Sequence, residues 1–563
     1  MWFSTVSRGV IHCAYINEKP ARLCDLYVLD PPPLKHGFLT QQDESYLLAA
    51  AKHLRRPPAP PPHATWPRMP VAGQRTALAL FAASAAIYIG RRRRLDEGRG
   101  RLGPSPAASD GGAGAGAVAG AGEGAIGSRG RASLKPTLPY LDSFMRCLVD
   151  PCHPDTNPRG YVSLCMAENR LVTGLLATRL VAGDAASVAF SSEATYGYGA
   201  SLGLSGTREA VARFLGRKFL GRDGGGGGIE PRHVAMGSGA ASLLNHVCFA
   251  LAEQGDAVLV PAPYYAAFES DMGTIAGCVP QPVEAAQPAD GPTVAELDAA
   301  RSYALRRGLR PRILLLTNPN NPLGTIYPPS FVRRCILWAR ERSIHTVVDE
   351  IYALSVHRPT ETPFESVLKT MEGDQGDDIH LLWALSKDFC ASGFRIGVLH
   401  SRNEALLRAL ANLNLLSGVS HPMQSVAASI LADDAFVDDF LDRSRAELER
   451  AYAIATRKLD EMVVPYVRAE AGMFLYADFS SLLPFATPAG EERFAALVVE
   501  AARVVMTPGG SMRDPRPGWF RICTAYYSTH EVLEIALERL SRLVIKIRSI
   551  GWENLESAKL RVL

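Results

Sequence analysis

The chain has 563 residues, of which 47% are hydrophobic and 21% are charged, and its formal net charge is +3. This length is too great for one simple core and allows two to four domains, while the near-neutral charge gives no sign of a nucleic-acid partner. Ten cysteines are scattered with no CxxC pair and no repeating spacing, so the sequence predicts no metal site and no disulfide framework, and reduced thiols in the cytosol are the simplest interpretation.

The N-terminal part of the chain differs in composition from the rest. Residues 1–75 form an N-terminal extension that is rich in proline. A start at Met69 would place the next apolar segment close to the N-terminus, and we therefore hypothesise that residues 1–68 are a gene-model extension. Residues 95–134 contain a long run of Gly, Ala and Ser, which cannot bury enough apolar surface to fold and therefore predicts a flexible linker.

Between these two segments, residues 76–94 combine an apolar run with the arginine cluster Arg91–Arg94. A helix of this apolar run would span about 22 Å, which is short of the roughly 30 Å hydrocarbon core of a bilayer. Two interpretations stay open: a single marginal membrane anchor, or a buried or interfacial helix. In the first case the arginines would stay on the cytoplasmic side, and everything downstream would lie in the cytoplasm. The charges follow the apolar run instead of preceding it, which argues against a cleaved signal peptide.

From about Leu134 onward, apolar runs of strand length alternate with amphipathic segments of helix length. The strand-like runs include Ala257–Val260, Ile313–Thr317, His345–Val348, His380–Trp383 and Gly397–His400. Such alternation predicts an α/β fold with a large, doubly wound, mostly parallel sheet. After about Asp433, helical patterns alternate with two further strand-like runs, which predicts a second, smaller α/β domain.

Polar side chains follow three of these strand-like runs. Asn321 lies in the Asn-Pro-Asn-Asn-Pro segment after the second run, Asp349 and Tyr352 follow the third, and Lys387 follows the fourth. Ligands of an open parallel sheet bind at the carboxyl ends of its strands. A turn at Asn321 or a helix cap at Asp349 would explain each motif by itself, but their joint occurrence in this order favours one site.

Lys387 and Arg395 together suit an aldehyde cofactor that carries a phosphate. A lysine amine forms a Schiff base with the aldehyde, and a nearby guanidinium clamps the phosphate. Asp349 suits the carboxylate that keeps a pyridine nitrogen protonated, so that the ring accepts electrons from a substrate carbanion. Asn321 and Tyr352 would place an amide and a phenol beside the ring's 3-oxygen. The sequence therefore predicts an enzyme that uses pyridoxal 5'-phosphate (PLP), with Lys387 also carrying the proton.

Five motifs carry a resemblance to a known family. They are MAEN at Met166–Asn169, TNPNNPLGT at Thr317–Thr325, VDEIY at Val348–Tyr352, Ser386–Arg395, and GWFR at Gly518–Arg521. Residues from about 135 to 545 resemble the fold-type I, PLP-dependent class-I aminotransferases, and within them the plant aminocyclopropane-carboxylate synthase family and its aminotransferase-like relatives. The resemblance implies a homodimer with shared active sites. The predicted parts are an N-terminal segment of the small domain (135–190), the large PLP-binding domain (191–432), the C-terminal small domain (433–545) and a tail (546–563).

The same resemblance implies roles for further residues. Arg521 would hold the substrate α-carboxylate through a bidentate fork. Glu168 and Asn169 would also contact the substrate. Tyr265 would stack on the cofactor ring, with core packing as the alternative. Backbone amides at the start of a helix would bind the phosphate, and they belong to Ala240, Ala241 and Ser242.

The phosphate-binding part departs from the pattern of the family. Hydroxyl-bearing residues are usual at the positions that this chain fills with Ala384, Ala241 and, for a tyrosine from the partner subunit, Ser201. Each lost hydrogen bond to the charged phosphate is worth about 1.5–3 kcal/mol. We therefore expect Arg395 and backbone amides, helped by Ser238 or Ser242, to hold the phosphate with a weaker affinity. Tyr196 and Tyr198 lie close in sequence to Ser201 and would be able to compensate.

We favour an aminotransferase that moves an amino group between an amino acid and a 2-oxo acid. The first alternative is an aminocyclopropane-carboxylate synthase that acts on S-adenosylmethionine, which Ser201 and Arg170 make less favourable because the family has tyrosine and glutamine there. The second alternative is a PLP-binding regulatory protein with little turnover. The catalytic domain is expected in the cytoplasm, and the sequence does not identify the amino donor.

Overall fold

The computed structural model describes residues 2–7, 10–15, 126–134, 138, 140–183, 185–222, 228–358 and 363–557. The chain forms two compact units, Met1–Gly116 and Ala117–Leu563. In the first unit, β1 (Trp2–Ser7) pairs antiparallel with β2 (Val10–Tyr15). The predicted anchor segment 76–94 and Met69 lie outside the described residues. Within the described ranges, no helix has both the length and the apolar character that a membrane crossing needs.

The second unit is built on a seven-stranded sheet with the order β4-β10-β9-β8-β7-β5-β6. Its strands are β4 (Val234–Gly237), β5 (Ala257–Ala262), β6 (Val279–Glu284), β7 (Pro311–Thr317), β8 (His345–Asp349), β9 (Ile379–Ala384) and β10 (Gly397–Ser401). Strand β10 is antiparallel to both of its neighbours, whereas the other neighbouring pairs are parallel. The prediction of a mostly parallel sheet is therefore confirmed, with β10 as the reversed strand.

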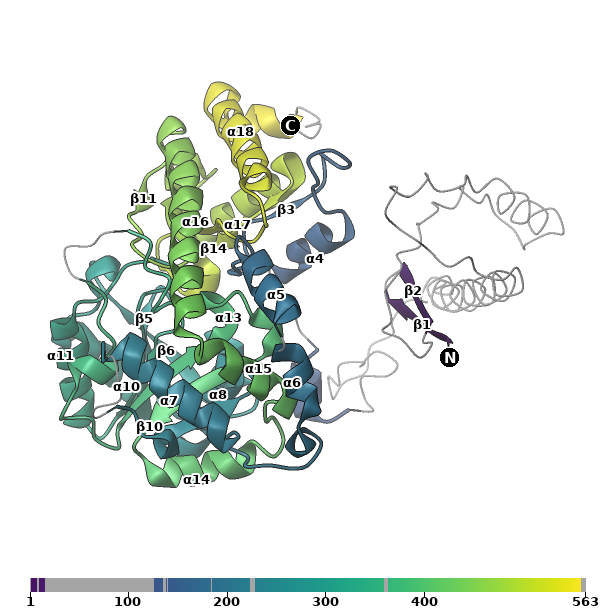
Figure 1. Ribbon diagram of the computed structural model, residues 1–563. Helices are drawn as coiled ribbons and strands as arrows, with labels where there is room; N and C mark the ends of the chain where they lie inside the picture. Colours follow the sequence, from purple (N-terminus) through teal and green to yellow (C-terminus); the bar gives the residue numbers. More distant parts are fainter. Residues whose placement is uncertain are drawn as a thin grey trace, which may run out of the picture. The chain divides into compact units, whose positions relative to one another are not determined.

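Alternating side chains of the strands supply two hydrophobic cores, one on each face of the sheet. Ile313 and Leu315 of β7 pack with α8 (Ala240–Leu251), α9 (Phe268–Gly273) and α14 (Glu404–Leu413). Leu314 and Leu316 belong to the opposite core. The helices of that core include α7 (Ser205–Phe219), α10 (Val294–Arg306), α11 (Pro329–Arg340), α12 (Val367–Thr370) and α15 (His421–Leu431). Because helices cover both faces of the sheet, the strands carry apolar residues on both of their sides (Figure 1).

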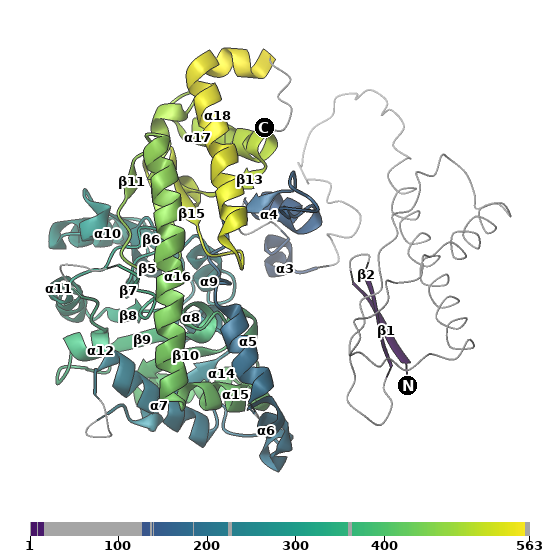
Figure 2. The same ribbon diagram turned by 45° about the horizontal axis from the view of Figure 1, so that its top comes forward.

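The smaller domain contains a four-stranded antiparallel sheet with the order β11-β12-β15-β14. Its strands are β11 (Tyr466–Val467), β12 (Phe474–Asp478), β14 (Thr507–Pro508) and β15 (Trp519–Cys523), and a separate parallel pair joins β3 (Val162–Ser163) to β13 (Val504–Val505). Its helices are α4 (Leu141–Val149), α16 (Asp434–Glu461), α17 (Pro488–Leu497) and α18 (His530–Ser557). Helices α16 and α18 run side by side (Figures 1 and 2).

The packing differs from the predicted division of the chain in three places. Helices α5 (Thr173–Ala182) and α6 (Ala185–Ser191) were expected in the small domain, but Leu176 and Ala189 pack in a core of the large sheet. The predicted tail 546–563 is helical as far as Ser557 with a kink at Gly551, and its residues Ile547 and Leu555 are buried in the small-domain core. The predicted linker contains the short helix α3 (Ser128–Ala132).

Candidate functional site

Three predicted residues lie at the carboxyl ends of neighbouring strands of the large sheet. Asn321 follows β7, Asp349 is the last residue of β8, and Lys387 lies in the short helix α13 (Leu385–Asp388) directly after β9. Asn321 Nδ2 donates to the hydroxyl of Tyr352 at 3.4 Å. The order β9-β8-β7 of the sheet thus brings together side chains that are up to 66 positions apart in the sequence, from Asn321 to Lys387.

The amine of Lys387 is largely withdrawn from water. Its Nζ donates to the main-chain oxygen of Ala167. Burial, and next the positive charge of Arg521, lower the pKa of Lys387 to about 8. A pKa near neutrality leaves part of the lysine as free amine, which is the form that attacks an aldehyde.

Asp349 is 6% exposed, and the only hydrogen bond to its carboxylate among the described residues is the donation from Ile351 N to Oδ1 at 3.2 Å. Burial raises the pKa of Asp349 to about 7. A protonated ring nitrogen would supply the positive partner that this buried carboxylate needs to ionise.

Arg521 is 2% exposed and is held by acceptors that carry no charge. Its Nη1 donates to Asn321 Oδ1 at 3.0 Å, and its Nη2 donates to the oxygen of Cys165 at 2.6 Å and to Thr507 Oγ1 at 3.3 Å. Its buried Nε has no acceptor among the described residues. A buried guanidinium with neutral partners and one free donor fits the carboxylate of a bound substrate.

A turn before α8 forms the second part of the site. Gly239 precedes this helix with φ of +90°, and a Cβ at Gly239 would lie 2.5 Å from Nη2 of Arg395. Only glycine therefore lets the guanidinium approach the helix start. The first residues of α8 are Ala240, Ala241 and Ser242, whose amides have no acceptor within the helix and, with the helix dipole, favour a phosphate.

Arg395 itself is exposed and has few contacts. Its Nη1 donates to the oxygen of Ser392 at 3.1 Å and its Nη2 to the oxygen of Ser238 at 3.4 Å. Ser242 Oγ hydrogen-bonds to Ser417 Oγ at 3.3 Å. A phosphate between Arg395 and the start of α8 would meet one mobile cation and a row of backbone donors.

The remaining predicted residues lie near the site with different contacts. Tyr265 is half-buried and packs edge-on against Phe268, with ring centroids 5.3 Å apart. Glu168 forms an ion pair with Arg170 at 2.7 Å. Asn169 is fully buried: its Nδ2 donates to Ser444 Oγ at 3.0 Å and its Oδ1 accepts from the amide of Leu171 at 3.1 Å. The side chain of Asn169 therefore anchors the Met166–Asn169 segment to α16, and its predicted contact with the substrate stays a prediction.

The segment around Ser201 does not restore the missing phosphate hydroxyl within one chain. The main-chain oxygen of Ser201 accepts from Asn414 Nδ2 at 3.1 Å. The hydroxyl of Tyr196 donates to the oxygen of Phe190 at 2.7 Å, whereas the side chain of Tyr198 is fully exposed. Of the two tyrosines, Tyr198 alone thus points its whole ring into the solvent.

Several groups of the site were not found from the sequence. Burial raises the pKa of Asp271 in α9 to about 7, and the positive charge of Arg395 acts against this rise. The oxygens of Cys165 and Ala167 and the hydroxyl of Thr507 hold the two cationic side chains. A main-chain oxygen cannot be recognised in a sequence, because every residue has one. A single aspartate on a helix looks the same in the sequence whether it lies in a site or on the surface.

These residues fit PLP on three observations. The turn at Gly239 is a cradle that a Cβ would fill, Arg521 has an orphaned buried donor, and Lys387 has a lowered pKa. Lys387 would hold the aldehyde, Asp349 the ring nitrogen, and Arg395 with the start of α8 the phosphate. Within the described ranges, no group of His, Cys, Asp and Glu side chains could hold a metal ion.

Comparison with known proteins gives the same assignment. The family model for aminotransferase class I and II matches residues 160–540. The 1-aminocyclopropane-1-carboxylate synthase 2 of Cucurbita pepo is 32% identical over 419 residues, which are 72% of this chain and 83% of that protein. The 1-aminocyclopropane-1-carboxylate synthase 4 of Oryza sativa subsp. japonica is 33% identical over 438 residues, which are 72% of this chain and 86% of that protein.

Solved structures share the fold at lower identity. Aspartate aminotransferase from Thermus thermophilus with maleate matches with a TM-score of 0.60 and 22% identity, covering 74% of this chain and 99% of that chain. The aromatic aminotransferase from Pyrococcus horikoshii matches with a TM-score of 0.58 and 20% identity, covering 69% of this chain and 96% of that chain. The chain therefore has the fold-type I architecture and belongs to the PLP-dependent class I and II aminotransferase family.

Proposed function

We propose that this protein is an aminotransferase that moves the amino group of an amino acid to a 2-oxo acid. The observation that carries the proposal is the buried guanidinium of Arg521, whose Nη1 donates to Asn321 and whose Nε has no acceptor among the described residues. Transamination asks the protein for a carboxylate clamp, a basic amine and a partner for the ring nitrogen. Arg521, Lys387 and Asp349 supply these three groups.

Each of these residues has a defined task in the reaction. When bound, PLP supplies an electron sink for the substrate α-carbon. Arg521 binds the α-carboxylate and fixes the orientation of the amino acid. The Nζ of Lys387 would accept the α-proton of the amino acid and deliver it to the cofactor side, which a pKa near 8 allows near neutral pH. Tyr352 and Asn321 keep their hydrogen bond beside Arg521, and Asp349 stays ionised once a cation lies next to it.

A second candidate is an aminocyclopropane-carboxylate synthase. The observation that favours it is the similarity to two proteins named 1-aminocyclopropane-1-carboxylate synthase. The matched residues are 32–33% identical and span most of the length of those proteins. The observations against it are Ser201 and Arg170, which stand at two positions where the synthases have other side chains. Arg170 lies over the ring of Tyr526 at 4.4 Å and pairs with Glu168, close to Lys387.

We also propose that the working unit is a homodimer. Large apolar side chains are exposed: Tyr198 is fully exposed, and Leu415 and Leu416 are 76% and 90% exposed. These segments lie against the phosphate-binding turn, because Asn414 contacts Ser201 and Ser417 accepts from the amide of Ser238 at 3.2 Å. A second copy that covers this surface would bury exposed apolar area next to the cofactor.

The test mixes the full-length protein, loaded with PLP, with a panel of amino acids and with S-adenosylmethionine. We expect one class of amino acid to convert the cofactor absorbance to that of the amine form and to release its 2-oxo acid. Cyclopropane product from S-adenosylmethionine would establish the synthase instead. If turnover does not exceed that of Lys387→Ala with any substrate, the protein is a PLP-binding protein without the proposed activity.

A further inference from the structure

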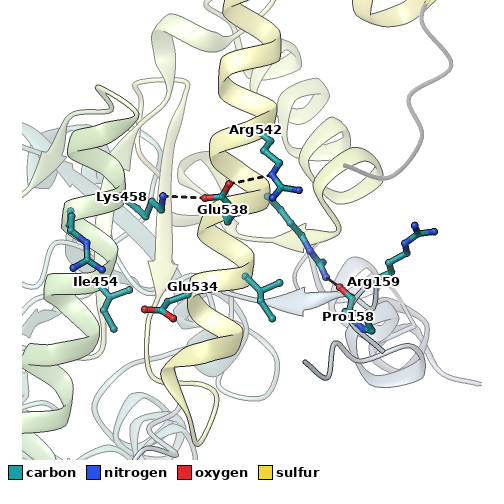
Figure 3. A pocket seen from close by; sticks show the side chains of 10 residues that line it. Pro158, Arg159, Ile454, Lys458, Glu534, Glu538 and Arg542 are labelled. Atoms are coloured by element: carbon teal, nitrogen blue, oxygen red, sulfur yellow. Dashed lines mark hydrogen bonds and ion pairs between the residues drawn. The ribbon is translucent and has the colours of Figure 1, made fainter. Parts of the chain in front are cut away.

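A groove between α16 and α18 has no role in the proposed reaction. Its volume is about 600 Å³, and it is closed at one side by the loop at Pro158 and Arg159 (Figure 3). None of the residues that line it belongs to the Lys387 site. Five of its ten lining residues are cationic and two are acidic, so the lining carries an excess of positive charge.

One of the two acids is already paired. Glu538 lies between Lys458 and Arg542, at 3.1 Å and 3.3 Å, as Figure 3 shows. Lys458 also contacts Glu461 at 2.8 Å. The charges at this position of the groove therefore balance within the protein. Glu534 is exposed and remains as the acid that opposes an anionic ligand.

The other cations have no carboxylate partner among the described residues. Arg539 is 5% exposed, and its Nη1 donates to the oxygen of Gly160 at 2.8 Å while its Nη2 contacts Cys152 Sγ at 3.5 Å and the oxygen of Pro158. These acceptors fix the guanidinium beneath the groove but leave its charge uncompensated. The side chains of Arg159 and Arg457 lie at the exposed margin, without an acid to hold them.

Apolar surface lies between the cationic groups. Ile454 of α16 and Ile535 of α18 are partly buried and line the groove. A buried, unneutralised guanidinium favours an oxyanion, and guanidinium forks match phosphate and carboxylate groups alike. We propose that this groove binds a small organic anion that carries at least two phosphate or carboxylate groups, with its apolar body against the two isoleucines.

The position of the groove relates it to the substrate site through one short stretch of chain. From Pro158 the chain passes through β3 to Cys165 and Ala167, whose oxygens hold Arg521 and Lys387. An anion that fixes the loop at Pro158 to α18 would restrain that stretch from its far end.

The experiment is calorimetric titration of the full-length, PLP-loaded protein with pyrophosphate and, separately, with citrate at constant ionic strength. Loading with PLP keeps the probes out of the phosphate turn at Gly239. We expect saturable binding of at least one probe. Binding of pyrophosphate alone would identify a phosphate ligand, binding of citrate alone a carboxylate ligand, and binding of both the shared oxyanion chemistry.

Three variants test the location. Arg457→Gln with Arg542→Gln should weaken binding about tenfold, which is about 1.4 kcal/mol. The matched control is Arg443→Gln with Arg450→Gln, which removes two exposed charges of α16 outside the groove and should leave the affinity unchanged. Glu534→Gln should tighten binding, because it removes the opposing acid.

Two results would overturn the proposal. One is that neither probe binds. The other is a groove variant that loses no more affinity than the control variant, which would mean binding at another site or diffuse attraction to a basic surface. Neither result bears on the aminotransferase proposal, because the titration involves no turnover and the variants change no residue of the Lys387 site.

Discussion

Arg521 and Arg395 serve the same site but are held in opposite ways. Arg521 is buried, and its three acceptors come from three separate segments of the chain, at Asn321, Cys165 and Thr507. Arg395 is exposed, has φ of 55°, and touches two nearby main-chain oxygens at 3.1 Å and 3.4 Å. The difference indicates that buried side-chain packing fixes the substrate part of the site, whereas the phosphate part has an exposed cation held by two main-chain oxygens.

The buried part should show the largest effect, in the stability of the cofactor-free protein. The folded-state pKa of Asp349 is about 7, raised from 3.8 by burial, so the folded state keeps a proton that the unfolded state loses between these values. Stability therefore falls as the pH rises through this window, and the ionised carboxylate is most costly above pH 7. In Asp349→Asn this cost is absent.

We therefore expect the stability advantage of Asp349→Asn over wild type to be larger at pH 8 than at pH 5, by about 2–3 kcal/mol in the free energy of unfolding. Urea unfolding of both proteins without PLP at the two pH values measures the difference. A variant that gains nothing at pH 8 would show that Asp349 is stabilised by contacts other than those seen around its carboxylate.

Arg521→Lys tests the buried arginine directly. A lysine ammonium carries its three donors on one nitrogen and lacks the planar fork of arginine, so it cannot serve the acceptors of both Nη atoms and the substrate carboxylate together. We expect kcat/KM for the amino donor to fall about 10²-fold, which is about 2.7 kcal/mol of transition-state binding, with the PLP dissociation constant little changed. Steady-state kinetics and a cofactor titration measure the two quantities.

Arg395→Lys should give the reverse pattern. The lysine keeps the charge but loses the fork that matches a phosphate, so the PLP dissociation constant should rise about tenfold, consistent with about 1.5 kcal/mol for one charged hydrogen bond. The KM of the loaded enzyme for its amino donor should stay within about twofold, because the exposed arginine does not contact Arg521 or its partners. If the two arginine variants gave the same pattern, the contrast between the two parts of the site would fail.

Gly239→Ala carries the smallest expected effect. The added methyl would lie 2.5 Å from Nη2 of Arg395, at a backbone φ of +90°. Arg395 is exposed and can move away, so we expect a rise in the PLP dissociation constant of about fivefold, near 1 kcal/mol. Gly393→Ala is the matched control, because a Cβ there meets nothing within 4 Å. Equal effects of the two substitutions would point to general loosening of the protein.

The site residues that directly follow strands could be predicted from the sequence. Asn321, Asp349 and Lys387 each follow an apolar run, and a parallel sheet brings the ends of such runs together. The large sheet followed from the same apolar runs. Their partners could not be predicted, because a main-chain oxygen such as that of Ala167 looks the same at every position.

Other parts depended on packing between distant segments. Leu176 of α5 and Leu555 near the end of α18 carry the same apolar pattern whichever core receives them, so their domains could not be assigned from periodicity. Asp271 lies in a six-residue helix without a motif, and only the folded chain brings it within electrostatic range of Arg395. The side-chain contacts of Asn169 depend in the same way on Ser444, which is 275 positions away.

Helix α16 has a consequence for how the molecule unfolds. Its first turns place Val437 and Phe440 in the core of the large sheet, its middle places Leu448 beside Tyr352, and its last turns place Ala455 and Leu459 in the small-domain core. One unbroken helix of 28 residues therefore belongs to both cores. If either core unfolded, about half of this helix would lose its apolar contacts. We therefore expect the two domains to unfold in a single cooperative transition.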